Sequence, residues 1–210
     1  MRRTQAIDVS ELPGIAFDTQ APMWWGNMLM MLIETMTVAL FVTSYFYLSQ
    51  NFTHWPPPNS GSIPPLHTPL PDLGYGSCVV ALLALATIPM VWADRAAHDM
   101  RPVPVVVGLS LGTAAGIAAI ILRVFEFQSL HVRWDDNAYG SLVWGLLSLH
   151  LLYIILEVGE AAINVVWILL HGMDEKHAVD ATLSTEYWYW TVAVALLIYG
   201  VIYWAPRLMS

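Results

Sequence analysis

The sequence predicts an all-α membrane protein, a bundle of five transmembrane helices, and three observations support this fold class. First, 57% of the 210 residues are apolar and only 11% are charged, a balance well outside that of soluble domains. Second, five stretches reach the roughly 20 mostly apolar residues that a helix needs to cross about 30 Å of hydrocarbon. Third, these stretches are apolar on every face, whereas a membrane-barrel strand alternates apolar and polar residues.

The five predicted spans follow one another without an internal repeat and without a hydrophilic segment long enough to fold separately. They cover residues 22–49, 73–93, 103–124, 139–171 and 187–206. The fourth is long enough to cross with tilt and continue beyond the bilayer. We therefore expect one five-helix transmembrane domain over residues 22–210.

The segments outside the spans include a polar N-terminal tail and a proline-rich loop. Acidic residues and a proline interrupt residues 1–21 where a signal peptide would need its apolar core, so we expect this tail to be retained and cytoplasmic. Residues 50–72 hold seven of the thirteen prolines and cannot be helical. We expect them to form an extended loop on the outer face.

Basic residues favour an orientation with the N-terminus inside and the C-terminus outside. Five of them fall on the side of the N-terminus: Arg2, Arg3, Arg95, Arg101 and Lys176. Three fall on the other side: Arg123, Arg133 and Arg207. The formal net charge of −8 argues against nucleic acid as a partner, because a phosphate-binding surface needs clustered lysine and arginine.

Two sequence features indicate how the helices are anchored and packed. Aromatic residues near the span ends, Trp24–Trp25 and Tyr187–Trp190 among them, are expected to lie at the membrane interface. In the third span Gly108, Gly112 and Gly116 recur every four residues and form a smooth stripe. The stripe predicts close packing against another helix without indicating which one.

Glu34 lies near the middle of the first span. A carboxylate at membrane depth costs about 2.5–3.5 kcal/mol, so its presence calls for a reason. Two interpretations remain open. Glu34 either handles protons or contacts lipid, or it forms a hydrogen bond across helices that fixes their packing.

The fourth span carries the densest polar pattern of the chain. Seven residues recur in steps of three and four: His150, Tyr153, Glu157, Glu160, Asn164, Trp167 and His171. This spacing places them on one helix face, which must line the bundle interior, a partner subunit or a hydrated cavity. A transmembrane proton path and a polar subunit contact are both compatible with these residue types.

Metal and haem sites fit the sequence less well. A di-metal carboxylate site would use Glu-x-x-His pairs, and the fourth span has none. A membrane cytochrome needs paired histidines at matching depths, yet of seven histidines only His150 lies well inside a span. We therefore expect no metal and no haem on this chain.

Several local signatures, in order, resemble subunit III of the haem–copper terminal oxidases. Residues 30–34 (MMLIE) resemble the family's helix with an embedded glutamate, and residues 92–95 (WADR) stand where Trp-Ala-His is common. Residues 123–127 (RVFEF) resemble its Gln-x-x-Glu-Tyr segment. Residues 136–141 (DNAYGS), with His150 following, resemble Asp-Gly-x-Tyr-Gly-Ser and the first of two helix histidines, and residues 186–190 (EYWYW) open the final helix.

The chain also departs from the family pattern. Tyr153 replaces the second helix histidine, Glu157 stands where small residues are usual, and residues 190–194 read WTVAV where Trp-His-Phe-Val-Asp is typical. The chain resembles the short five-helix members of the family, which lack the two helices that form the lipid-binding cleft of the longer form. A bound phospholipid is therefore compatible with the resemblance, but the complete lipid-binding cleft of the longer form is not implied for this chain.

The resemblance implies a non-catalytic subunit of a cytochrome c or quinol oxidase in a bacterial inner (plasma) membrane. Its partners would be catalytic subunit I, subunit II and membrane lipids, with haem and copper held by the partner subunits. The chain would stabilise the oxidase during turnover and support proton uptake or oxygen access, with Glu34 and Glu126 as the matched carboxyls. Two alternatives remain: a related protein associated with nitric oxide reductase, and a small proton-coupled transporter using Glu34, Glu157 and Glu160.

Overall fold

The computed structural model describes residues 17–57 and 70–209. Within these residues all regular structure is helical, and five helices are long and apolar enough to cross a membrane, which confirms the predicted all-α fold class. Most of the predicted N-terminal tail, residues 1–16, and the middle of the proline-rich loop, residues 58–69, lie outside the described residues.

The long helices are α1 (Pro22–Ser49), α2 (Leu73–His98), α3 (Pro102–Gln128), α4 (Ala138–His171) and α5 (Glu175–Tyr199). A π-helical segment, Gly200–Trp204, joins α5 to the short helix α6 (Ala205–Met209), and a 3-10 turn, Asp18–Gln20, precedes α1. Two helices are longer than the predicted spans at their C-terminal ends, since α2 continues to His98 and α3 to Gln128. The largest difference is in α5, which begins at Glu175 rather than at the predicted Tyr187.

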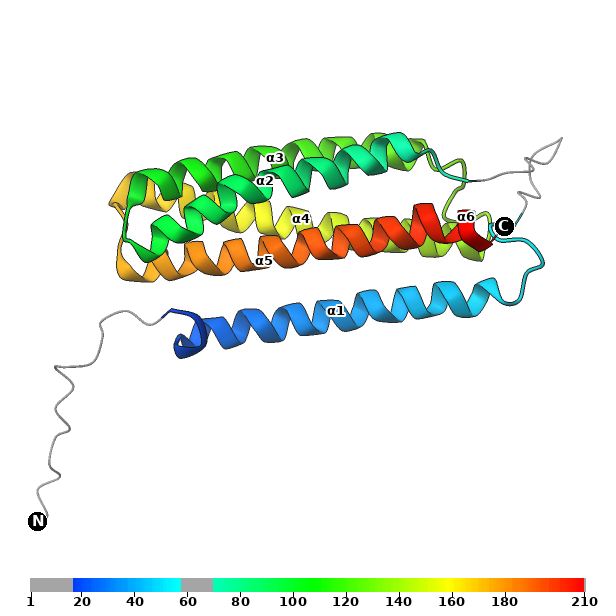
Figure 1. The fold of residues 1–210 in the computed structure, drawn as a ribbon, viewed down its shortest axis with the longest axis horizontal. Coiled ribbons are helices and arrows are strands. Elements are labelled where there is room, and N and C mark those ends of the chain that lie inside the picture. The colour runs from blue at the N-terminus through cyan, green and yellow to red at the C-terminus, as the bar shows by residue number, and fades with distance from the viewer. Residues whose placement is uncertain (1–16, 58–69, 210) are drawn as a thin grey trace, which may run out of the picture.

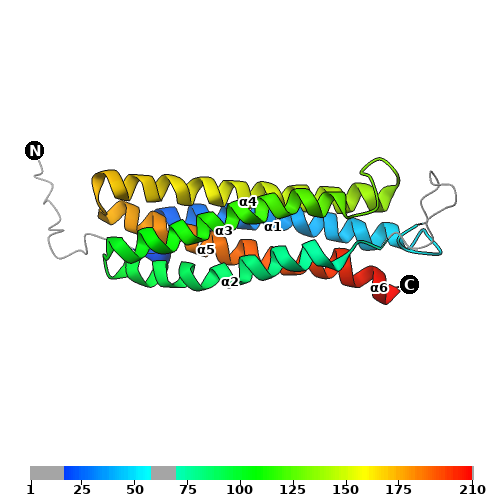
Figure 2. The same cartoon turned by 90° about the horizontal axis from the view of Figure 1, so that it is seen from above.

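Helices α2, α3, α4 and α5 form a four-helix bundle, and α1 lies along one side of it against α4 and α5 (Figures 1 and 2). One end of the bundle, here called the proximal end, holds the start of α1 and the α2–α3 and α4–α5 turns. The opposite, distal end holds the α3–α4 loop and α6. Successive long helices therefore run in alternating directions from α2 to α5, as short connections require.

The ends of the helices are fixed by capping residues. At the start of α4 the Asn137 side chain accepts a hydrogen bond from the Gly140 amide at 2.8 Å. At the start of α5 Asp174 accepts one from the His177 amide at 2.9 Å, and this bond holds the pKa of the Asp174 carboxyl below its usual value. Pro22 and Pro102 open α1 and α3, positions at which a missing amide hydrogen costs nothing.

The glycine stripe of α3 packs inside this chain, against two different helices. A Cβ atom on Gly108 would lie 2.5 Å from the carbonyl oxygen of Pro89 in α2, and one on Gly112 would overlap the sulfur of Met90. On Gly116 it would overlap the side chain of Val158 in α4. The stripe thus allows α3 to approach both neighbours closely, and its surface is not available to a partner subunit.

Candidate functional site

A buried polar cluster lies in the distal half of the bundle and joins three helices. Within α3, Arg123 donates to Glu126 at 2.6 Å, with the two side chains 4% and 0% exposed. The hydroxyl of Tyr203, from the π-helical segment, donates to the other Glu126 oxygen at 2.6 Å. The second terminal nitrogen of Arg123 lies 2.9 Å from Nδ1 of His150 in α4. The guanidinium and carboxylate charges therefore compensate each other away from solvent.

The hydrogen bonds of this cluster define the form of His150. Arginine can only donate, so Nδ1 of His150 accepts from Arg123. Its Nε2 lies 3.1 Å from the carbonyl oxygen of Thr191 in α5, and a carbonyl can only accept. The imidazole is therefore neutral, with its proton on Nε2, and both of its nitrogens are bonded within the protein.

Arg123 is a functional-site residue that the sequence reasoning missed. It was counted among the outer-side charges, at the end of the predicted span 103–124, but α3 continues to Gln128 and buries it. The sequence did contain a signal that Arg123 could be buried. Glu126 follows three residues later, and residues at this spacing face each other on a helix, so the two charges can compensate. With Arg123 inside the bundle, the described loops and ends of the distal side retain Arg133 and Arg207.

Glu34 lies at the contact between α1 and α5. Its carboxylate accepts a hydrogen bond from the Tyr187 hydroxyl at 2.9 Å, and the Tyr153 hydroxyl of α4 lies 3.5 Å from its backbone carbonyl oxygen. The side chain is partly buried. This geometry is compatible with a cross-helix bond that fixes packing, one of the two interpretations that the sequence left open.

Three further polar contacts hold α1 against α5. The indole nitrogens of Trp24 and Trp190 donate to Glu186 at 2.9 Å and to Thr35 at 2.8 Å. Asn27 donates to the carbonyl oxygen of Leu183 at 3.2 Å. Together with the Glu34 bond these form the α1 ties, and they matter because most of α1 is exposed rather than packed on the bundle.

The aromatic run of α5 does not lie at a span end, as was expected of interfacial anchors. Tyr187 and Trp188 are each 1% exposed and lie well inside a helix that begins at Glu175. Trp188 donates to Thr87 of α2 at 3.3 Å. The early start of α5 accounts for this difference, since it moves these rings into the bundle.

The seven-residue polar face of α4 divides between the interior and the surface. His150, Tyr153, Glu157 and Asn164 are buried, whereas Glu160, Trp167 and His171 are exposed. A repeat of 3.5 residues drifts by about 20° per heptad around a helix of 3.6 residues per turn. Glu160 and Trp167 lie at the edge toward which the pattern drifts, so they leave the interior while Asn164 remains in it.

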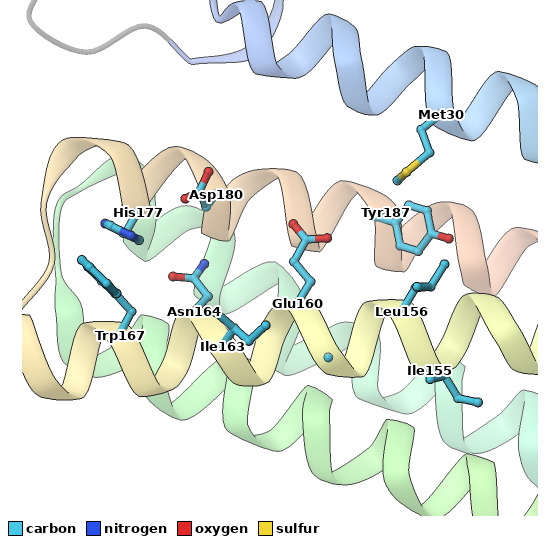
Figure 3. A pocket seen from close by; sticks show the side chains of 11 residues that line it. Met30, Ile155, Leu156, Glu160, Ile163, Asn164, Trp167, His177, Asp180 and Tyr187 are labelled. Atoms are coloured by element: carbon cyan, nitrogen blue, oxygen red, sulfur yellow. The ribbon is translucent and has the colours of Figure 1, made fainter.

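Glu157 is enclosed between α4 and α5. It is 1% exposed, and one carboxyl oxygen accepts a hydrogen bond from Ser184 at 2.8 Å. The other oxygen has no hydrogen-bond partner among the described residues. Glu160, one turn away, faces a groove of about 620 Å³ between α4 and α5 near the proximal end (Figure 3).

The DNAYGS signature forms the turn that starts α4 rather than a chemical site. Asp136 accepts from the Arg133 amide at 2.8 Å, Asn137 caps the helix, and the Ser141 hydroxyl donates to the Trp134 carbonyl at 2.7 Å. A Cβ atom on Gly140 would overlap the Arg133 carbonyl oxygen, so only glycine fits there. This motif places His150 by fixing where α4 begins.

Residues that could bind a metal ion do not come together in the part of the chain that the structure describes. No three histidine, cysteine, aspartate or glutamate side chains are grouped closely enough there. His150, which is fully buried, has no free nitrogen for an iron atom.

Comparison with known proteins identifies a family that this chain matches. The family described as "Cytochrome c oxidase subunit III" matches residues 14–206. The chain is 23% identical to cytochrome c oxidase subunit 3 of Myxine glutinosa over 150 residues, covering 71% of this chain and 55% of that protein. It is 23% identical to the Yarrowia lipolytica protein, covering 71% of this chain and 53% of that protein. It is 22% identical to the Lachancea kluyveri protein, covering 85% of this chain and 66% of that protein. The chain thus spans between about half and two thirds of the length of these relatives.

Proposed function

Since this chain belongs to the cytochrome c oxidase subunit III family, we propose that it is a non-catalytic subunit of a haem–copper terminal oxidase. It binds catalytic subunit I, with subunit II in the same complex, and the haem and copper reside on those partners. Its role is to stabilise the catalytic subunit during turnover and to support proton uptake or oxygen access.

The observation that carries this proposal is the internal use of the buried polar groups. Arg123, Glu126, His150 and Tyr203 bond to one another and to the Thr191 carbonyl. These hydrogen bonds join α3, α4 and α5 to one another. Such a cluster fixes the relative positions of helices, which is what a stabilising subunit requires.

The orientation and location follow from the charges and the resemblance. With Arg123 buried, two basic residues, Arg133 and Arg207, remain on the distal side, against Arg95, Arg101 and Lys176 among the described residues of the proximal side. The positive-inside rule supports an orientation with the proximal end, and with it the start of α1, on the inner face. The resemblance to the short five-helix members favours a bacterial inner membrane.

A proton-coupled transporter is less compatible with the distal cluster. Glu160, Glu157 and Glu34 supply carboxyl groups along part of the bundle. A proton route that continued toward the distal end would next meet His150 and Arg123. There His150 bonds to Arg123 and to the Thr191 carbonyl, so its imidazole is not free to relay a proton. The cluster therefore favours the accessory-subunit proposal over transport.

The experiment is a pull-down of the tagged chain from its native membrane in a gentle detergent, followed by a reduced-minus-oxidised optical spectrum. The proposal predicts haem bands and a large multi-span partner, with the haem type deciding between an oxidase and the nitric oxide reductase alternative. A folded, colourless chain that emerges alone would refute the proposal, and uptake by that chain in liposomes would then test the transporter.

A further inference from the structure

The groove between α4 and α5 is lined by polar and apolar side chains. Asn164, Glu160 and Trp167 come from α4, whereas His177 and Asp180 come from α5, and Met30 reaches toward it from α1 (Figure 3). Its apolar side chains include Ile163, which is 72% exposed. The groove opens to the outside of the bundle near the proximal end, at the level where α1 begins.

Asn164 is the feature that points to an occupant. Its side chain lines the groove and is only 4% exposed, yet neither its oxygen nor its nitrogen has a hydrogen-bond partner in the described chain. Leaving one buried polar group unpaired costs about 1–3 kcal/mol. Because the side chain lines the groove, an occupant that donates hydrogen bonds can supply the partner that the amide oxygen lacks.

The charges around Asn164 indicate the sign of that occupant. The Glu160 and Asp180 carboxyls both line the groove, and the charged group that acts on Glu160 is Asp180. Neither carboxyl has a hydrogen bond or an ion pair within the described residues. Lys176 and His177 act on Asp180, but His177 is bonded to Asp174 and stacks on Trp167. No cation in the described part of the chain acts on Glu160 in this way.

We propose that this groove receives the lysine or arginine side chain of a transmembrane helix from a partner subunit. The inference rests on the proposed function, which supplies the partner, and it identifies the surface and the chemistry of the contact. A basic side chain offers several N–H donors to Glu160, Asp180 and the Asn164 oxygen, and its aliphatic stem fits the apolar side chains of the groove. A metal ion is a poorer occupant, because no group of three suitable ligands exists among the described residues.

The first test replaces the two carboxyls by amides of the same size. The double variant Glu160→Gln/Asp180→Asn is compared with Glu175→Gln, which removes a charge from an exposed position at the start of α5 outside the groove. The readout is the rate at which the tagged chain leaves the haem-containing complex in detergent. We expect the double variant to leave at least about tenfold faster than the wild type, with the control unchanged.

The second test uses Asn164→Leu, for which the proposal predicts effects of opposite sign. In the isolated chain this substitution removes an unpaired buried amide, so the melting temperature should rise or stay the same. In the complex it removes a contact to the partner, so dissociation should be faster. A fall in melting temperature together with faster dissociation would mean that Asn164 is merely structural and would overturn the proposal.

The outcomes separate the proposed function from the proposed contact. If the wild type brings no haem-containing partner, the proposed function itself fails. If the wild type brings the partner and the double variant holds it equally well, the groove proposal alone fails. Native mass spectrometry then identifies the other occupant, since loss of a bound phospholipid from the double variant with the partner retained would assign the groove to lipid.

Discussion

At the scale of single residues, the most consequential feature is an ion pair with no access to solvent. Arg123 and Glu126 are both nearly fully buried, and His150 and Tyr203 bond to one further atom of each, whereas the Nε of Arg123 has no partner among the described residues. A buried ion pair often adds little net stability compared with an apolar pair of the same size, but removal of one partner leaves an uncompensated charge. The cluster therefore defines how α3, α4 and the end of α5 fit together.

The first prediction concerns this pair. Arg123→Met should lower the free energy of unfolding by about 3–5 kcal/mol, because it leaves Glu126 charged and buried. The double variant Arg123→Met/Glu126→Gln should recover most of that loss, since neither charge remains. Thermal unfolding of the purified chain in detergent measures both. A single variant as stable as the wild type would show that the pair is not charged in the way described.

The second prediction uses the glycines of α3. Gly108→Ala should cost about 1–3 kcal/mol, because the new methyl group meets the backbone oxygen of Pro89, which cannot move aside. Gly112→Ala should cost less, because its methyl group meets the flexible Met90 side chain. Gly159→Ala is the control, with nothing within 4 Å, and should be neutral or slightly stabilising. Melting temperatures that do not follow this order would contradict the packing described.

At the scale of helices, α1 differs from the rest of the molecule. Its main contacts with the long helices are to α4 and α5, most of its surface is exposed, and its ties to α5 are hydrogen bonds of polar side chains. Interhelical hydrogen bonds in membranes contribute about 0.6 kcal/mol each on average. The attachment of α1 is therefore a sum of small contributions.

The third prediction follows from these ties. Trp24→Phe/Tyr187→Phe should increase the rate of hydrogen exchange in α1 by about fivefold, because it removes two of the ties, while exchange in α2 and α3 stays the same. Tyr47→Phe is the matched control, since Tyr47 is 68% exposed and makes no hydrogen bond within the described residues. Equal exchange in all three proteins would mean that the ties do not hold α1.

The sequence was sufficient to predict that these helices exist and that they can span a membrane, because runs of about 20 apolar residues rarely occur outside membrane-spanning helices. It did not predict where α5 begins, because residues 175–186 are largely polar. These residues form helix because Asp174 caps them and because Ser184 and Leu183 contact α4 and α1. Such tertiary contacts override local polarity and cannot be derived from hydropathy.

The candidate site was predictable only in part, for a similar reason. The heptad spacing of α4 predicted one polar face, of which four residues are buried, but the drift of that spacing moves Glu160 and Trp167 to the surface. The neutral state of His150 depends on Arg123 and Thr191, which lie on two other helices. Sequence alone does not give these neighbours.

At the scale of the whole molecule, the arrangement of charges predicts which end faces the cytoplasm. The fourth prediction tests it with single cysteines in a Cys78→Ser background: Asp99→Cys in the proximal α2–α3 turn and Asp135→Cys in the distal α3–α4 loop, both exposed. A membrane-impermeant maleimide added to intact spheroplasts should label position 135 and reach position 99 only after permeabilisation. The reverse pattern would invert the proposed orientation.

The central claim is that this chain stabilises an oxidase without carrying its redox centres, and removal of the chain from the complex tests it most directly. The complex is purified from cells with and without the chain, and haem absorbance per catalytic subunit is measured together with oxygen consumption over many turnovers. We predict unchanged haem absorbance and a retained initial rate, followed by faster loss of activity that re-expression of the chain reverses. A fall in haem absorbance, or identical activity decay with and without the chain, would contradict the claim.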